Sequence, residues 1–382
     1  MNTHKTLAFA AVLAALGAPA ALAQIRIGAT LAETGPAGAL GDPEAKTLRL
    51  LVEQINAAGG VLGEPLELVL YDDGGDPNNA RTFATRLVEH DEVVAIIGGT
   101  TTGTSLAIRS VAEEEEIPFI SLAGGIEIID PVQPFTFKTP HTDRMACEKI
   151  FEDMQAQGVS RIGMISGTDG FGASMRNQCL SVAETYGITV AADESYAPGD
   201  ADMVPQLTNI RNTEGLQAVL NPGFGAGPAI VTRNYRQLGI ELPLYQSHGV
   251  AGQAYIDLSG AENAEGVRLP GTALLIADQL AEDDVQRAAV VAYRDAYVGR
   301  YNEPVSTFGG YAHDALAILV DAITRNGEAE PDPTDLRDAI EATSGLVGTT
   351  GIYSFTAEDH LGLDLSAFRL LEIRNGGWTQ VQ

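Results

Sequence analysis

The 382-residue chain is strongly acidic, with 51 Asp and Glu residues, 23 Lys and Arg residues and a formal net charge of −28 at pH 7. This balance argues against nucleic acid and anionic membrane surfaces as partners, because both would repel the protein. It does not exclude a small anionic ligand, since a single pocket can differ in charge from the surface around it.

Residues 1–23 have the pattern of a secretory signal peptide. Lys5 precedes an Ala/Leu-rich stretch, and the segment ends in Ala21-Leu22-Ala23, the small-x-small pattern of a cleavage site. The apolar stretch is shorter than the roughly 20 residues that span a bilayer. We therefore expect export to the periplasm and a mature protein that begins at Gln24, with a length that suits two domains.

Strands and helices alternate along the rest of the chain. Apolar and β-branched runs predict strands over residues 25–31, 66–71, 93–97, 117–122, 161–166, 189–195, 217–221, near 244, 368–374 and 378–381. Apolar residues at helical spacing predict helices over 78–89, 144–157, 174–186, 204–212, 229–238, 284–301 and 308–326. Two further helices are predicted from the same spacing, one with Leu48, Leu51, Val52 and Ile55 that ends at Ala58-Gly59-Gly60, and one with Leu106, Ile108 and Val111. Alternation of this kind predicts an α/β fold with doubly wound parallel sheets.

Extended segments interrupt this alternation and predict crossovers between two lobes. We expect crossovers over residues 135–140, 266–277 and 353–359. Lobe 1 would then comprise residues 24–139 plus 273–353, and lobe 2 would comprise residues 140–272 plus 354–382. The expected architecture is two doubly wound parallel-sheet lobes that are joined by three crossover strands.

Local signals predict the ends of several elements. Residues 33–43 are so rich in Gly and Pro that they predict a loop. The acids around Asp76 lack the order of a calcium loop, so Asp76 and Pro77 are expected to be the N-cap and first residue of a helix. The acids over 113–116, at the end of another helix, predict a solvated face.

The loop after the strand at 93–97 is the main candidate for a binding site. Gly98 and Gly99 end this strand, and the segment from Thr100 to Ser105 supplies hydroxyl groups where a helix begins. Free backbone N–H groups and side-chain donors would face an anion at the carboxyl end of the strand. Residues 123–125 end the next strand at the same crevice. A Gly/Thr turn that only reverses the chain direction is the alternative.

Other motifs point away from catalysis and cofactors. The GxGxG pattern at residues 223–227 lacks the dinucleotide-binding spacing, and neither a phosphate-binding loop nor a nucleophile elbow occurs. Cys147 and Cys179 lie on consecutive predicted helices, without the spacing of a metal or redox site. A disulfide between them is allowed after export, although spacing does not show whether they are close. We expect a protein that is not an enzyme and that holds no cofactor or metal.

With the crossovers in place, the chain resembles the periplasmic substrate-binding proteins of ABC importers, in particular the leucine/isoleucine/valine-binding family with its type I two-lobed fold. The resemblance covers essentially the whole mature chain. It rests on TLAETGPAGALGDPEAK, AIIGGTTTGTSLA with IPFISLAGG, DGFG, and FTAEDHLGLD. It implies capture of an amino acid or related carboxylate by closure of two lobes, delivery to an ABC permease and ATPase in the inner membrane, and a monomeric state.

The resemblance also implies individual roles. The family's carboxylate-binding hydroxyl falls on Thr102, and its backbone contacts fall on Ala123 and Gly125. Aromatic residues that cover the ligand fall on Phe171 and Phe224. Ordinary packing of these two rings within their Gly-rich loops is the alternative.

Departures from the family pattern concern the rest of the pocket. His248 stands where leucine-binding relatives place a Glu for the ligand ammonium, and Gly125 replaces an expected hydroxyl. Leu40 stands where those relatives have Tyr, and Leu40 and Phe308 match positions that line the side-chain pocket. A neutral His cannot form the charge-assisted pair that a carboxylate forms with an ammonium.

Either another acid therefore replaces this Glu, or the ligand is an aromatic or aliphatic acid without an ammonium. His248 could instead be a structural loop residue. The sequence also allows a periplasmic ligand sensor for a signalling partner in place of a transport receptor.

Overall fold

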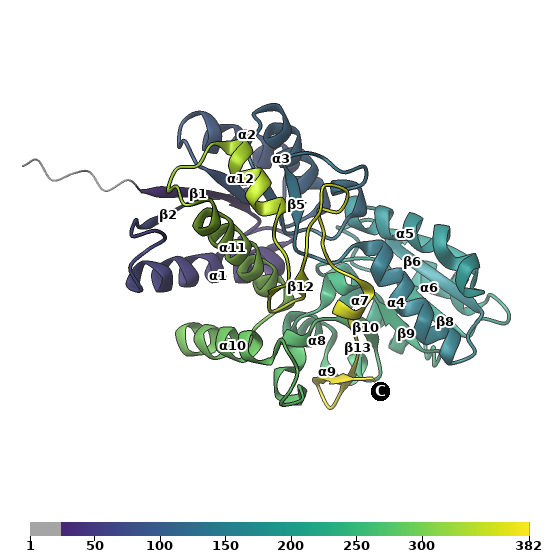
Figure 1. Ribbon diagram of the computed structural model, residues 1–382. Helices are drawn as coiled ribbons and strands as arrows, with labels where there is room; N and C mark the ends of the chain where they lie inside the picture. Colours follow the sequence, from purple (N-terminus) through teal and green to yellow (C-terminus); the bar gives the residue numbers. More distant parts are fainter. Residues whose placement is uncertain (1–23, 382) are drawn as a thin grey trace, which may run out of the picture.

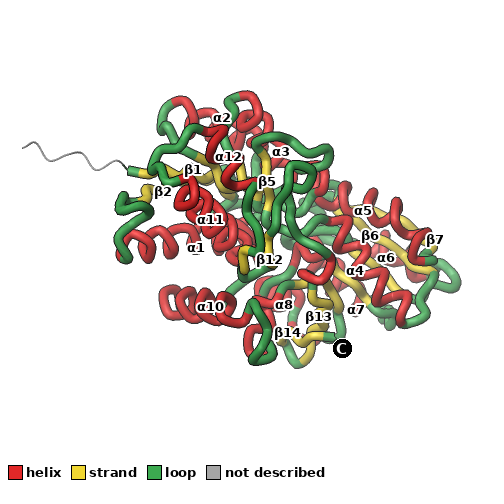
Figure 2. The backbone as a smooth tube through the Cα atoms, in the orientation of Figure 1, coloured by secondary structure: helices red, strands yellow, loops and turns green. Residues whose placement is uncertain are grey.

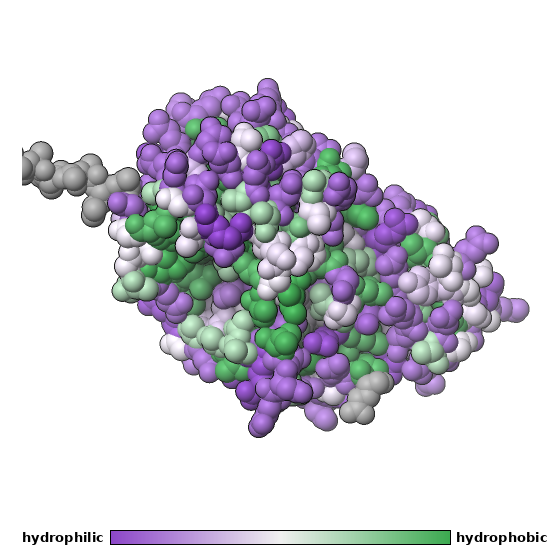
Figure 3. All heavy atoms as spheres, viewed as in Figure 1, coloured by the Kyte–Doolittle hydropathy of each residue, from purple (hydrophilic) through white to green (hydrophobic). Residues whose placement is uncertain are grey.

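The computed structural model describes residues 24–381, which form two α/β lobes side by side (Figure 1). The signal peptide expected over residues 1–23 lies outside the described residues. Hydrophilic residues cover most of the face in Figure 3, and apolar residues gather toward its middle. Between residues 24 and 381, every helix is too short or too polar to cross a membrane.

Lobe 1 is built on a five-stranded parallel sheet in the order β2-β1-β3-β4-β5. The strands are β1 (Ile25–Leu31), β2 (Leu66–Asp72), β3 (Ala95–Gly98), β4 (Phe119–Ser121) and β5 (Thr136–Lys138). One face packs against α1 (Gly38–Ala57), α11 (Thr307–Asn326) and α12 (Pro333–Glu341). The other packs against α2 (Pro77–Glu89) and α3 (Thr102–Glu114). Strands that are buried on both faces explain the continuous apolar runs in the sequence.

Lobe 2 is built on a seven-stranded sheet in the order β14-β13-β10-β9-β8-β6-β7. The strands are β6 (Arg161–Gly167), β7 (Thr189–Tyr196), β8 (Ala218–Asn221), β9 (Leu244–Gln246), β10 (Arg268–Gly271), β13 (Arg369–Arg374) and β14 (Gly377–Gln380). One face packs against α4 (Asp143–Ala156) and α5 (Gly170–Val182). The other packs against α6 (Val204–Arg211), α7 (Gly227–Gln237), α8 (Gln253–Ser259) and α9 (Ala261–Ala264).

The predicted α/β class with two sheet-based lobes is confirmed, with one correction to strand direction. Strands β13 and β14 run antiparallel to their neighbours, so the second sheet is mixed rather than purely parallel. Asn375 and Gly376 connect them, both with positive φ. An Asn-Gly pair in this conformation makes a two-residue hairpin turn, which requires antiparallel strands.

The chain passes between the lobes after β5, after β10 and after β12 (Ile352–Tyr353), which pairs with β11 (Leu346–Val347). Figure 2 shows connecting loops in the middle of the molecule. The second and third connections are less extended than expected. Residues Ala273–Gln279 form short 3₁₀ turns, and Thr356 and Asp359 close a tight loop. The lobe boundaries stay a prediction.

The loop expected over residues 33–43 is wrong in its second half, because α1 already begins at Gly38. A Cβ at Gly41 would lie only 2.2 Å from the carbonyl oxygen of Ala32, at the end of β1. Glycine at this position therefore allows close packing of helix against strand rather than a turn. Leu40, in the first turn of the helix, is buried.

Other local predictions have mixed outcomes. The Asp76 carboxylate caps α2 by accepting hydrogen bonds from the backbone of Asn78 and Asn79, as predicted. The solvated face expected over residues 113–116 is wrong for Glu113. Its carboxylate accepts hydrogen bonds from the Phe135 backbone and, at 2.6 Å, from the Thr136 hydroxyl.

Cys147 and Cys179 form a disulfide between α4 and α5, with a Cα–Cα distance of 5.1 Å. Both residues are fully buried in the core of lobe 2. The disulfide that the sequence allowed is therefore present in the structure.

Candidate functional site

The start of α3 faces the crevice between the lobes, and its threonines have different tasks. Thr101 is the N-cap, and it forms a reciprocal capping box with Thr104. The Thr100 hydroxyl accepts a hydrogen bond from the Ala32 backbone and donates one to Glu44 at 2.6 Å. These three hydroxyl groups are therefore occupied by the structure of lobe 1.

The Thr102 hydroxyl is the one that remains able to donate to a ligand. It accepts a hydrogen bond from the backbone N–H of Gly125 at 3.3 Å, and no acceptor for its own proton lies among the described residues. The side chain is buried at the positive end of α3, where the first backbone N–H groups of a helix have no intrahelical partner. Thr102 thus offers donors that suit a carboxylate.

Ala123 and Gly125 differ in their relation to the crevice. The Ala123 N–H donates to the Ser121 hydroxyl at 3.2 Å, and no described donor reaches its carbonyl. The Gly125 N–H donates to Thr102, and its carbonyl accepts from the Lys138 ammonium at 3.3 Å. Gly125 therefore supports Thr102 from behind. A Cβ at Gly125 would lie 2.5 Å from the Thr102 methyl carbon, so the hydroxyl side chain of the relatives would not fit here.

A small cavity, which we call the inner chamber, has a volume of about 30 Å³ next to Thr102. Its lining comes from both lobes and consists of Leu40, Thr100, Thr101, Thr102, Leu122, Ala123, Gly124, Pro140, Phe171, Phe224, His248, Gly249, Phe308 and Tyr311. The structure therefore brings together every site residue expected from the sequence except Gly125.

Lobe 2 contributes Phe171, Phe224 and His248, which follow the carboxyl ends of the neighbouring strands β6, β8 and β9. Lobe 1 contributes residues that follow β3 and β4. Ligands of parallel α/β sheets bind at such strand ends. The Phe171 ring stands edge-on to Phe224 and His248, with ring centroids 6.3 and 5.3 Å away. The two predicted aromatic residues therefore form one wall.

The His248 side chain is buried, and neither ring nitrogen has a hydrogen-bond partner among the described residues. Burial lowers the pKa of His248 well below its usual range, and the nearby His141 and Lys138 add to this shift. The imidazole is therefore neutral at physiological pH. It can donate a hydrogen bond to a ligand or accept one from it, but it carries no negative charge.

Acidic side chains do not line the inner chamber. Glu44 lies behind Thr100 and is fully buried, and burial raises its pKa well above the usual range. Among the described residues, the chamber therefore offers no carboxylate for a ligand ammonium. The chamber has a donor-rich end at Thr102 and an aromatic, uncharged remainder.

Sequence reasoning missed Tyr311 and His141. Tyr311 lines the inner chamber one helical turn after Phe308, and its buried hydroxyl has no described partner. His141 stacks on Phe368 at 3.9 Å between ring centroids, and both of its ring nitrogens are also without partners. The i,i+3 spacing from Phe308 could have identified Tyr311. His141 follows the first crossover, which must pass the crevice.

A buried ionic cluster joins the lobes below the inner chamber. Lys138 from β5 lies near Asp143 from α4 and Glu127. The Ser174 hydroxyl of α5 is within hydrogen-bond distance of both carboxylates and donates its single proton to one of them. Burial lowers the pKa of Lys138 and raises that of Asp143. Within residues 24–381, no group of three His, Cys, Asp or Glu side chains is arranged to hold a metal ion.

The family described as "Periplasmic binding protein" matches residues 24–377. Among curated relatives, the chain is 27% identical to the leucine-, isoleucine-, valine-, threonine- and alanine-binding protein of Pseudomonas aeruginosa, over 304 residues that cover 78% of each chain. It is 25% identical to a Leu/Ile/Val-binding protein homolog of Brucella melitensis over 330 residues, 85% of this chain and 86% of that one.

Solved structures agree with this assignment. An extracellular ligand-binding receptor from Rhodopseudomonas palustris HaA2 superimposes with a TM-score of 0.87 and 27% identity, over 94% of this chain and 100% of that one. The branched-chain amino acid transporter substrate-binding protein LivJ from Streptococcus pneumoniae, solved with isoleucine, has a TM-score of 0.82 and 24% identity over 93% of this chain and 98% of that one. The second likeness shows the shared fold.

Proposed function

The chain belongs to the periplasmic binding protein family, and we propose that it is the receptor of an ABC importer for a small carboxylic acid without an ammonium group. The family consists of solute-binding proteins of the periplasm, and the chain is a binding protein rather than an enzyme. The ligand, the partner and the closing motion are the parts that we propose.

The observation that carries the proposal is the pairing of Thr102 with an inner chamber that has no acidic wall. Thr102 offers a hydroxyl proton and a helix N-terminus to a ligand carboxylate. An α-amino acid would also bring an ammonium, which needs several acceptors when it is removed from water. The Ala123 carbonyl and neutral His248 supply acceptors without charge. An acid without an ammonium avoids this desolvation cost.

The walls favour an aromatic or aliphatic body for this acid. Phe171, Phe224 and Phe308 line the inner chamber together with Leu40. Burial of apolar ligand surface against such walls contributes about 25 cal/mol per Å². A keto oxygen of the ligand that accepts a hydrogen bond from Tyr311 or His248, or a ligand hydroxyl that bonds to either of them, would satisfy side chains that have no partner among the described residues.

Branched-chain amino acids are the second candidate ligand, because the curated relatives are named for binding them. On this alternative, the Ala123 carbonyl would be the principal acceptor for the ammonium. In both cases we propose that export cleaves the chain before Gln24, and that the monomeric receptor delivers its ligand to an inner-membrane permease and ATPase.

The test is thermal stabilisation of the mature protein by a panel of α-amino acids and of acids without an ammonium. Ligand at a hundred times its Kd should add about 2.7 kcal/mol to the unfolding free energy. We expect a response to the acids and little or none to the amino acids. A response to amino acids alone would contradict the proposed ligand, and no response to any carboxylate would contradict the site.

A Thr102→Val variant tests the site within this panel. Loss of a hydrogen bond to a charged group costs about 1.5–3 kcal/mol, so the Kd should rise by at least about tenfold. Thr82→Val is the matched control, since the Thr82 hydroxyl is exposed on α2 and bonds only to the backbone of its own helix. Equal affinity in both variants would exclude Thr102 as the carboxylate site.

A further inference from the structure

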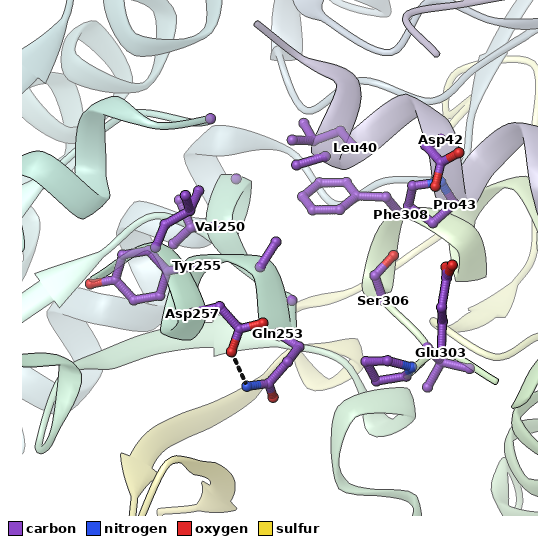
Figure 4. Close-up of a pocket in the computed structure, with 18 of the residues that line it drawn as sticks. Leu40, Asp42, Pro43, Val250, Gln253, Tyr255, Asp257, Glu303, Ser306 and Phe308 are labelled. Atoms are coloured by element: carbon purple, nitrogen blue, oxygen red, sulfur yellow. Dashed lines mark hydrogen bonds between the residues drawn. The ribbon is translucent and has the colours of Figure 1, made fainter. Parts of the chain in front are cut away.

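A second and larger cavity, which we call the outer chamber, adjoins the inner chamber between the lobes. Its volume is about 270 Å³, and it is open to solvent. Figure 4 shows the residues that line it. Lobe 1 lines it with the start of α1 and with residues 303–308, which join α10 (Arg287–Tyr301) to α11. Lobe 2 lines it with residues 249–258, which include α8.

The two chambers share part of their lining. Leu40, Gly249 and Phe308 border both of them. In Figure 4, Leu40 and Phe308 lie side by side on one wall, and Val250 and Tyr255 lie across the chamber from them. A Cβ at Gly249 would lie 2.8 Å from the Gly223 carbonyl oxygen, so a larger residue does not fit at this border. The chambers therefore adjoin at Leu40, Gly249 and Phe308.

The outer chamber has apolar walls and acidic side chains. Leu258 of α8 is 48% exposed, an unusual exposure for a leucine that borders a cavity. The Lys46 ammonium pairs with both Asp42 and Glu303, since it lies 2.7 Å from a carboxylate oxygen of each, and its single charge offsets only one of the two carboxylates. Asp257 has no cationic partner among the described residues and accepts a hydrogen bond only from Gln253.

We propose that the ligand spans both chambers, with its carboxylate at Thr102 and an apolar body that passes Leu40 and Phe308 into the outer chamber. This inference rests on the proposed function and narrows its ligand to an elongated monocarboxylic acid. Two features support it. The chambers share the lining residues Leu40, Gly249 and Phe308, and the Asp257 carboxylate, which has no cationic partner among the described residues, would repel a second anionic group at the far end.

Chain length is the first test, with benzoate, phenylacetate, 3-phenylpropanoate and 4-phenylbutanoate as probes in calorimetric titrations of the mature protein. Each methylene group that extends the acid into the apolar chamber should lower the Kd about fourfold. If the acids bind with no gain along the series, the two-chamber ligand is excluded while the carboxylate site stands. If none of them binds, the proposed function fails as well.

Substitutions that fill the outer chamber are the second test. Ala254→Phe from lobe 2 and Ala39→Phe from lobe 1 place a ring in the chamber from opposite walls, at exposed helical positions that tolerate it. Each should raise the Kd of 4-phenylbutanoate more than that of benzoate. Ala156→Phe, at an exposed position on α4, is the matched control and should leave the series unchanged. Equal effects on short and long acids would overturn the inference.

The third test concerns the charge at the end of the ligand that lies in the outer chamber. Hexanoate should bind at least about tenfold more tightly than adipate, its dicarboxylate counterpart, because Asp257 faces the second carboxylate. Asp257→Asn should reduce this preference. Equal binding of the two acids by the unmodified protein would contradict the inference, as would a preference that Asp257→Asn does not change.

Discussion

His248 lies in the inner chamber among aromatic rings. Its ring centroid is 5.3 Å from that of Phe171 and 5.4 Å from that of Phe368, both at steep angles. Such edge-on contacts fix the imidazole in place, and burial keeps it neutral. Because His248 is neutral where a carboxylate would be negative, it does not offset the free energy that a ligand ammonium loses when it leaves water. A ligand without an ammonium does not have this cost.

We predict that His248→Glu changes the preferred ligand from an acid without an ammonium to an α-amino acid. The introduced carboxylate should raise the Kd of an acid without an ammonium by at least about tenfold, because two buried anions repel each other. It should also produce thermal stabilisation by branched-chain amino acids. His248→Gln is the control, since it keeps a hydrogen-bonding group without charge and should retain the acid. Identical ligand profiles for the Glu and Gln variants would contradict this prediction.

His141 gives the folded protein a distinct pH dependence. Burial, together with Lys138, lowers the pKa of His141 to about 3, whereas a histidine in an unfolded chain has a pKa of about 6.5. Between these values the unfolded chain binds a proton that the folded chain does not. The free energy of unfolding therefore falls as the pH falls from about 6.5 toward 3, by at most about 1.4 kcal/mol per pH unit for this residue.

His141→Phe should remove this slope while it preserves stacking on Phe368. Burial raises the pKa of Asp143, which has the opposite effect at low pH, so the comparison must be the difference between the variant and the unmodified protein. Urea unfolding from pH 7 to pH 4.5 would measure it. The stability loss on acidification should be smaller in the variant, and parallel curves would show that His141 takes up a proton in the folded state.

At the scale of elements, the disulfide ties α4 to α5 within lobe 2. The two cysteines are 32 residues apart in the sequence, and a cross-link that closes a loop of this size contributes about 2–4 kcal/mol. Helix α5 also carries Phe171 at its first turn, next to the N-cap Asp169. The bridge thus steadies the helix that presents one wall of the inner chamber.

The double variant Cys147→Ala and Cys179→Ala should lower the free energy of unfolding by about 3 kcal/mol. Chemical denaturation of the oxidised protein and of the variant would measure the difference. Reduction of the unmodified protein should have a similar effect, and the same reductant should leave the variant unchanged. A variant as stable as the oxidised protein would contradict a stabilising role for the bridge.

At the scale of the molecule, ligand contacts from both lobes should favour the closed arrangement. The inner chamber takes Thr102 from lobe 1 and Phe171 and His248 from lobe 2, so a ligand that touches all three binds best when the lobes are together. The backbone N–H of Asp143 also donates to the Gly124 carbonyl, close to the first connection between the lobes.

Small-angle X-ray scattering should therefore detect compaction when a tightly binding acid is added. The radius of gyration should decrease, because closure of two lobes about short connections brings their centres together. Thr102→Val at the same ligand concentration is the control and should compact less. Superimposable curves with and without saturating ligand would contradict closure as the mode of capture.

Much of the fold could be predicted because its signals are local. Buried parallel strands produce apolar runs. Asp76 followed by Pro77 marks the N-cap and the first residue of α2. The start of α1 could not be predicted in this way. Glycine and proline near Gly41 are typical of a turn. Only the structure shows that the Ala32 carbonyl lies against Gly41, so that the glycine allows α1 to pack closely on the end of β1.

The candidate site divides along the same line. The loop between strand and helix identified the segment from Thr100 to Ser105, and the resemblance to a family identified Thr102, Phe171 and His248. Tyr311 was not identified, because its place in the lining depends on α11, which is distant in sequence. His141 was not identified either, because its ring packs near Tyr311 and Phe368 from the first connection between the lobes. The outer chamber had no sequence signal at all, since its walls belong to both lobes.

The sequence by itself determined the α/β class, the presence of two lobes and a donor-rich segment from Thr100 to Ser105 where a helix begins, because each follows from the order and spacing of neighbouring residues. Only the tertiary structure decided that Gly125 supports Thr102 from behind, that no acid lines the inner chamber, and that a second chamber adjoins it. These facts depend on which surfaces two separately folded lobes bring together, and that juxtaposition has no local pattern in the chain.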